Sequence, residues 1–210
     1  MGFYSDNPGD DLRLGDVVIG FPVATPAAHD KEPGRRSVQW QIRAVLPDYL
    51  VVMTPCCSIE KKCLLLAPLG PIRPSFLKNE WWREDLTHLN RTMPWEKSLP
   101  PEHLAKMSEE DRAAGSLAPP AYAFGECFIY PPHPILGAYA LPMKPTPQDV
   151  GHYMIDFKTV FRLECDFINR PAKAPPGTKL LELAIPARRD LRAKLAQFFA
   201  RVPEEDLVPG

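Results

Sequence analysis

The chain has 210 residues, of which 45% are hydrophobic and 24% are charged, and its net charge is −1. This composition is typical of a globular protein that buries a sizeable core, and the near-neutral charge does not favour nucleic acid or an anionic membrane as a general partner. The sequence contains no apolar run of about 18 residues, so we expect no transmembrane helix and no membrane partner.

Two further counts bear on structure and location. The 26 prolines lie mostly between apolar runs, which predicts short strands joined by stiff connections. The first eleven residues show no basic region followed by an apolar one, so we expect a cytoplasmic protein without a secretory signal. In that compartment the five cysteines are expected to be free thiols or ligands rather than a disulfide framework.

The first third of the chain reads as a set of short strands. We predict strands over Val17–Val23, Val38–Ala44, Tyr49–Thr54 and Cys63–Ala67, with a loop over Ala24–Arg36. In the second strand apolar and polar residues alternate, which is the pattern of a half-buried strand. Four short strands with hairpin-like links predict a small curled antiparallel sheet or barrel.

The middle of the chain, residues 71–120, is rich in proline and charge and is interpreted as an insertion with helical parts. A short helix is expected over Glu80–Asn90 and a better one over Pro101–Ala114, with Ser108 and Asp111 able to cap its second half.

The last part returns to strand and ends in a helix. Strands are predicted over Tyr122–Tyr130, Ile135–Leu141 and Leu180–Ile185, and a long amphipathic strand over Tyr153–Phe167. A helix is expected from Pro186, a residue favoured in the first turn. Its apolar stripe should pack on the sheet and consists of Leu191, Leu195, Phe198, Phe199 and Val202.

The fold class predicted from these elements is α+β. An SH3-like antiparallel barrel would begin with residues 12–70, carry the insertion 71–120, and be completed by strands and the C-terminal helix in 121–203, packed on the same domain.

Three of the cysteines lie at the corner between two apolar runs, which raises the question of a metal site. Tetrahedral zinc needs four Cys or His ligands, usually in two short-spaced pairs. The candidates are Cys57, Cys63, Cys127 and His133, but both pairs have five intervening residues rather than two to four. The alternative is that the strand cysteines are small buried hydrophobes, and we expect no metal and no cofactor.

The same corner could instead hold a reactive thiol. Cys57 follows a strand end, and Lys61 and Lys62 could lower the pKa of its thiol. A catalytic base would have to come from elsewhere, with His133 and His152 among the candidates, and no local motif requires either.

Basic and aromatic residues suggest binding surfaces. Arg188, Arg189, Arg192 and Lys194 are expected on the polar face of the terminal helix, where they could hold phosphates or simply be solvated. The pair Trp81 and Trp82 could form an exposed recognition surface or pin the insertion to the core.

One stretch resembles a known family. The opening L-G-D-V-V-I-G-F-P, the charged loop with Arg35 and Arg36, and a strand pair that closes in L-L-L-A-P-L are similar to ribonuclease toxins of the MazF/PemK type. The resemblance covers residues 12–70 and implies an SH3-like barrel, with Arg35 or Arg36 as a phosphate ligand. This chain departs from the family pattern at Ser37, where a proline would follow the loop, and at Gly70, where a hydroxyl residue would stand.

The role expected from these observations is that of a bacterial cytoplasmic interaction module, connected with defence or toxin–antitoxin function, that binds a protein or a nucleic acid. A ribonuclease of the toxin type and a Cys57-centred metal or thiol enzyme are the alternatives. A ribonuclease of the toxin type needs a hydroxyl residue together with an arginine. This pair is therefore the sequence feature that discriminates the ribonuclease from the other two roles.

Overall fold

The computed structural model describes residues 2–30, 38–55, 58–59, 63–117, 120–164 and 177–200. It shows a mixed α+β chain that divides into two compact units. We call Asn7–Pro68 with Thr159–Glu182 the sheet unit, and Met1–Asp6, Leu69–Lys158 and Leu183–Gly210 the helical unit. The two units are described separately.

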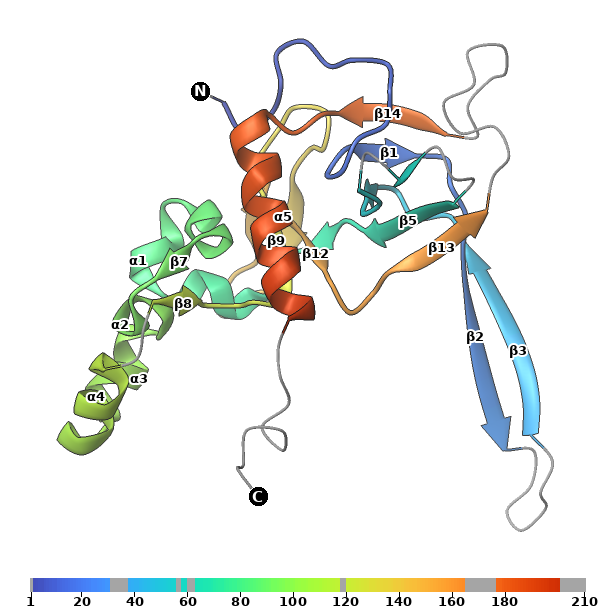
Figure 1. Ribbon diagram of the computed structural model, residues 1–210. Helices are drawn as coiled ribbons and strands as arrows, with labels where there is room; N and C mark the ends of the chain where they lie inside the picture. The colour runs from blue at the N-terminus through green and yellow to red at the C-terminus, as the bar shows by residue number, and fades with distance from the viewer. Residues whose placement is uncertain are drawn as a thin grey trace, which may run out of the picture. The chain divides into compact units, whose positions relative to one another are not determined.

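The sheet unit is built on an antiparallel sheet of five short strands in the order β13-β5-β4-β1-β14 (Figure 1). The strands of the sheet are β1 (Val17–Ile19), β4 (Leu50–Val52), β5 (Cys63–Pro68), β13 (Phe161–Glu164) and β14 (Thr178–Leu181). Every neighbouring pair is antiparallel. Among the described residues no pairing joins β13 to β14, so the sheet is not closed into a barrel there.

Apolar and β-branched residues explain why these short segments are strands. All three residues of β4 are buried, as expected for a central strand of valine and leucine. The core of the unit is formed by Val18, Phe21, Val23, Leu50, Val52, Ile59, Leu64 and Leu66.

Two further strands of the sheet unit form a sheet of their own. β2 (Val23–Asp30) and β3 (Val38–Val45) pair along their whole length as an antiparallel ribbon, which projects from the five-stranded sheet in Figure 1. The predicted strand Val17–Val23 is therefore wrong, since β1 ends at Ile19. Gly20 follows with φ = 88°, a backbone conformation that glycine adopts without strain. The predicted loop from Ala24 is strand up to Asp30, because pairing with β3 overrides its low strand propensity.

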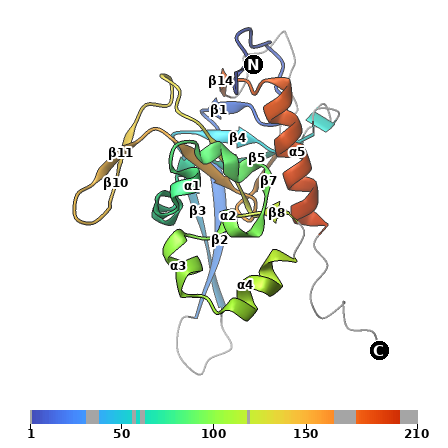
Figure 2. The ribbon, with the colours of Figure 1, turned by 90° about the vertical axis from the view of Figure 1, so that its left-hand side faces the viewer.

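The helical unit has a three-stranded antiparallel sheet in the order β6-β12-β9. Its strands are β6 (Gly70–Pro71), β9 (Cys127–Tyr130) and β12 (Tyr153–Asp156). Two small pairs accompany it, β7 (Thr92–Met93) with β8 (Ala121–Tyr122), and the hairpin of β10 (Tyr139–Leu141) and β11 (Gln148–Val150) seen in Figure 2.

The helices of this unit are mostly short. They are the 3-10 helices η2 (Pro74–Lys78) and η3 (Leu86–Asn90), and the α-helices α1 (Glu80–Arg83), α2 (Trp95–Ser98), α3 (Pro101–Lys106), α4 (Glu109–Ser116) and α5 (Ile185–Phe199). The core of the unit consists of Ile72, Phe76, Trp82, Leu86, Leu89, Met93, Cys127, Ile129, Leu141, Val150 and Met154.

Capping side chains divide the helices that the sequence predicts as continuous. The segment Glu80–Asn90 is α1 followed by η3, because the Asp85 carboxylate accepts from the Thr87 amide and starts a new helix. The segment from Pro101 is α3 and α4, and Figure 2 shows them as separate helices. Ser108 caps α4 by accepting from the Asp111 amide, which confirms the predicted capping role.

The prediction of one long strand over Tyr153–Phe167 is wrong, because the segment forms two separate strands. It consists of β12 and β13, which belong to different sheets, and its last three residues lie outside the described part. Between the strands the Asp156 carboxylate accepts from the Lys158 amide at 2.9 Å, an Asx-type contact that turns the chain. Alternation alone cannot reveal such a turn.

An asparagine side chain completes the edge of β9. The buried Asn90 donates to the Ile129 carbonyl and accepts from the Ile129 amide, both at 2.7 Å. The side-chain amide of Asn90 thus makes the two hydrogen bonds that a neighbouring strand would make. The buried backbone amide and carbonyl of Ile129 therefore need no other partner.

Helix α5 begins one residue before the predicted Pro186. Of its predicted apolar stripe, Leu191 is buried, Leu195 and Phe198 are half-buried, Phe199 is exposed, and Val202 lies outside the described residues. The helix also buries Ala187, Arg188 and Lys194, which the predicted stripe did not include. None of the helices in the described ranges has both the length and the apolar character needed to cross a membrane.

Candidate functional site

The ribbon of β2 and β3 has one apolar face. Its register places Ile42 opposite Pro26 and Ala44 opposite Ala24. Directly opposite residues of an antiparallel pair, and residues two apart on one strand, project from the same side. Among the residues whose side chains the structure describes, the apolar face carries Ala24, Pro26, Trp40, Ile42 and Ala44, and the opposite face carries Val23, Thr25, Ala27, Gln41, Arg43 and Val45.

The apolar face is uncovered in the structure. Trp40 is 70% exposed and Ile42 is 76% exposed, and beyond the end of β3 Leu46 is 66% exposed. The strand predicted over Val38–Ala44 is confirmed, but it is not half-buried. Alternation places the apolar residues on one side of the strand, and no other described element of the sheet unit covers that side. A patch of neighbouring exposed apolar side chains marks an interaction surface more often than the rest of a protein surface does.

The segment that contains the ribbon carries a small net positive charge. Residues 23–45 contain four basic and two acidic residues, a net charge of +2, so the rest of the chain carries −3. The candidate phosphate ligands Arg35 and Arg36 belong to this segment and lie outside the described residues. Arg43, on the polar face, is exposed.

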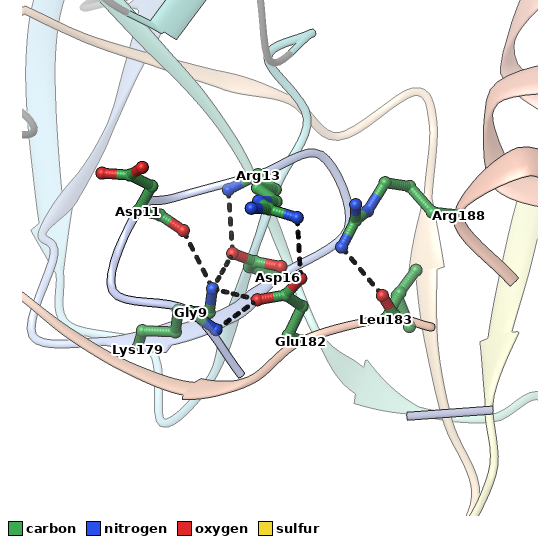
Figure 3. A network of polar contacts seen from close by, with 8 residues as sticks. All are labelled: Gly9, Asp11, Arg13, Asp16, Lys179, Glu182, Leu183 and Arg188. Atoms are coloured by element: carbon green, nitrogen blue, oxygen red, sulfur yellow. Dashed lines mark hydrogen bonds and ion pairs between the residues drawn. The ribbon is translucent and has the colours of Figure 1, made fainter. Parts of the chain in front are cut away.

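A buried polar network lies elsewhere in the sheet unit (Figure 3). The Lys179 ammonium contacts the carboxylates of Asp16 at 2.9 Å and Glu182 at 2.7 Å, and it donates to the carbonyl of Asp11. Glu182 also accepts from the Gly9 amide and pairs with Arg13. The network fastens the segment before β1 to β14, so its role is structural.

Asp16 is the unusual member of this network. It is fully buried, and burial raises its pKa to about 6 although the Lys179 ammonium and the Arg13 amide act in the opposite direction. The hydrogen bonds reach only Oδ2, and Oδ1 has no partner within the described residues. A carboxyl group in this setting titrates near neutral pH.

In the helical unit a lysine is completely buried on α5. The Lys194 ammonium donates to the Leu89 carbonyl at 2.5 Å and lies 5.4 Å from the centre of the Tyr122 ring. It also lines a cavity of about 220 Å³ together with Gln197 and Phe198. The predicted position of Lys194 on the polar face of the helix is therefore wrong, because this side chain lies on the buried side together with Leu191.

A second cavity of the helical unit has a volume of about 310 Å³. Its charged lining consists of Asp85, Arg91 and Asp190, with Arg91 3.8 Å from Asp190. Asp85 in turn lies 3.8 Å from the His88 imidazole and accepts from the Thr87 hydroxyl. Each acid of the cavity thus has a partner from the protein.

The proposed metal ligands are not brought into a cluster by the described residues. Cys63 belongs to β5 of the sheet unit, and Cys127 and His133 belong to the helical unit. The His133 imidazole accepts from the Ile135 amide and packs edge-on against Tyr4. In the described ranges no three Cys, His, Asp or Glu side chains are placed to hold a metal ion.

The structure describes the surroundings of the Cys127 thiol but not those of Cys57. Cys57, the candidate nucleophile, lies outside the described residues. Cys127 is buried, and burial raises its thiol pKa to about 11, so it remains protonated and unreactive at neutral pH.

The basic and aromatic candidates are divided between surface and core. Arg189 and Arg192 are exposed, whereas Arg188 is buried and donates to the Leu183 carbonyl at 2.8 Å. Trp81 is 44% exposed with the Lys97 ammonium 4.5 Å above its ring, and Trp82 is buried in the core. The pair therefore has one surface member and one packing member.

No protein-family model, curated protein or solved structure matches this chain. Its function has to be inferred from its own residues, and the apolar face of the ribbon is the most distinctive surface they form.

Proposed function

We propose that this chain is a bacterial cytoplasmic interaction module, of a defence or toxin–antitoxin kind, that binds a protein partner through the apolar face of the ribbon. The observation that carries the proposal is the exposure of Trp40 and Ile42 on one side of a two-stranded ribbon. The free thiols of Cys63 and Cys127 suit a reducing compartment.

A protein partner suits this face better than a nucleic acid does. Among the side chains that the structure describes on the apolar face, only the Trp40 indole is a hydrogen-bond donor, whereas base edges are read by paired donors and acceptors. The polar groups Gln41 and Arg43 project from the other side of the ribbon. Protein interfaces, in contrast, are centred on tryptophan and aliphatic side chains that become fully covered.

We also propose that the sheet unit belongs to the SH3-like class of the MazF/PemK-type toxins. The support is a sheet of five short antiparallel strands around one core, with a long hairpin inserted directly after β1.

Site-specific photocrosslinking in the native host tests the binding proposal. The variants are Ile42→p-benzoylphenylalanine on the apolar face and Gln41→p-benzoylphenylalanine on the opposite face of the same strand. We expect a discrete protein adduct at position 42 that is absent at position 41 and is lost when Trp40→Ala is added. Equal adducts at both positions, or none at position 42, would refute the proposal. An adduct that nuclease removes would assign the face to nucleic acid instead.

The second candidate function is a ribonuclease of the toxin type, favoured by the basic charge of residues 23–45. In that reading Arg35 or Arg36 holds the scissile phosphate. Its test is RNA cleavage by purified protein, which the double variant Arg35→Ala, Arg36→Ala should abolish. Unchanged cleavage by this variant would dismiss the assignment.

A further inference from the structure

The cavity of about 310 Å³ in the helical unit has walls that hydrogen bonds hold in place. On one side the Phe3 carbonyl accepts from the Ala184 amide at 3.0 Å, and on another the Pro131 carbonyl accepts from the Tyr4 hydroxyl at 2.7 Å. The Asn90 side chain, also part of the lining, makes two hydrogen bonds to the backbone of β9. The cavity has the size of a small ligand site, for which about 300 Å³ is the lower end. Because its walls are fixed by the protein itself, a ligand does not have to order them.

The charged side chains of the lining have both signs. Two are acidic, Asp85 and Asp190, and one is basic, Arg91. The distance of 3.8 Å between the Arg91 Nε and the Asp190 Oδ2 is an ion-pair contact too long for a hydrogen bond. Within the described residues these two side chains make no closer polar contact, so the donors of the guanidinium and the oxygens of the carboxylate are available to a ligand.

The second acid of the cavity is also ionised at neutral pH. Burial raises the pKa of Asp85, but hydrogen bonds from Thr87 and the imidazoles of His88 and His152 lower it below the ordinary value. The two Thr87 hydrogen bonds reach Oδ1, whereas Oδ2 has only the His88 contact at 3.8 Å. A carboxylate oxygen of Asp85 therefore remains able to accept a hydrogen bond.

The rest of the lining includes an apolar part. Phe3, Pro131 and Pro186 are half-buried and Ala187 is buried. Few charged groups beside apolar walls are the usual composition of a site for a small molecule, since the walls supply burial and the charges fix its orientation.

We infer that this cavity binds a small zwitterion, a free α-amino acid with an apolar side chain. In this site Arg91 donates to the ligand carboxylate, and Asp85 and Asp190 accept from its ammonium group. A simple carboxylic acid would meet two carboxylates of its own sign, and a simple amine would leave the guanidinium without a partner, so neither suits the lining as well. The inference does not depend on the role of the ribbon.

Saturation-transfer NMR on the purified full chain tests the inference with L-leucine as the probe. We expect a dissociation constant of about 0.1–1 mM, as befits so small a ligand. Two further probes each lack one charge of leucine: 4-methylpentanoate has no ammonium group, and 3-methylbutylamine has no carboxylate. Each should bind at least about tenfold more weakly than leucine, because one set of charged partners is then left unused.

Charge-removing variants assign the two ends of the ligand. Asp190→Asn and Arg91→Gln should each weaken leucine binding about tenfold. Asp190→Asn should not weaken 4-methylpentanoate, and Arg91→Gln should not weaken 3-methylbutylamine, since these probes lack the group that each side chain binds. The matched controls are Asp149→Asn and Arg189→Gln, at exposed positions of the same unit outside the cavity, and they should leave the dissociation constant of leucine within about twofold.

No leucine binding up to about 10 mM would overturn the inference, as would equal effects of the cavity variants and their controls. The comparison of the three probes on the wild-type protein does not depend on any variant folding well. If either single-charge probe binds as tightly as leucine, the cavity does not recognise a zwitterion and the inference is refuted.

Discussion

The Asn90 side chain offers the sharpest test of how the helical unit is held together. Asn90→Ala removes both hydrogen bonds to Ile129 and leaves its buried amide and carbonyl without partners. Each buried group left unsatisfied costs about 1–3 kcal/mol. The free energy of unfolding should therefore fall by about 2–6 kcal/mol, with about 4 kcal/mol as the central value.

Urea unfolding followed by tryptophan fluorescence measures this loss, since Trp82 lies in the same core. The control is Thr87→Ala, which removes a hydroxyl bonded to the exposed carboxylate of Asp85 and should change stability by less than about 1 kcal/mol. Asn90→Asp keeps the size and one acceptor but loses the donor, so it should be nearly as damaging as the alanine variant. A loss below about 1 kcal/mol for Asn90→Ala would show that the amide does not act as a strand neighbour.

Two further variants test the buried charges. Because the folded protein raises the pKa of Asp16 to about 6, it binds the proton more tightly than the unfolded chain does. The free energy of unfolding should thus decrease by about 3 kcal/mol as the pH rises from about 4 to above 6. Asp16→Asn should flatten that part of the profile in urea titrations, whereas Asp48→Asn, at an exposed position, should not, and an unaltered slope in Asp16→Asn would contradict the assignment. Lys194→Met keeps the buried volume but withdraws the hydrogen bond to the Leu89 carbonyl, so we expect a loss of about 1–3 kcal/mol. A thermal or urea midpoint equal to that of the wild type would show that the ammonium contributes nothing net.

The short-range features of the fold could be predicted from the sequence because they depend on neighbouring residues. Ser108 caps α4 through a bond to an amide three residues away, and the apolar Leu50–Val52 forms a strand because its side chains suit a buried sheet. The alternation in β3 likewise predicted a strand with two unlike faces. Such signals are written in a few consecutive residues.

The candidate site, in contrast, could not be predicted from neighbouring residues, because it depends on which segments of the chain pack on them. Alternation in β3 could not show that the apolar side remains uncovered, because coverage is a property of distant segments. The charges of Arg188 and Lys194 predicted that both side chains are exposed to solvent. Both are buried, because they donate hydrogen bonds to the carbonyls of Leu183 and Leu89.

The sequence by itself determined the α+β class, several short strands such as Leu50–Val52, the Ser108 cap of α4, and a β3 strand with one apolar side. Only the tertiary structure decided that this side is exposed on a separate ribbon and that two cations of α5 are buried. The physical reason is that a local pattern sets which way a side chain points, whereas burial and hydrogen-bond partners depend on segments far away in the chain.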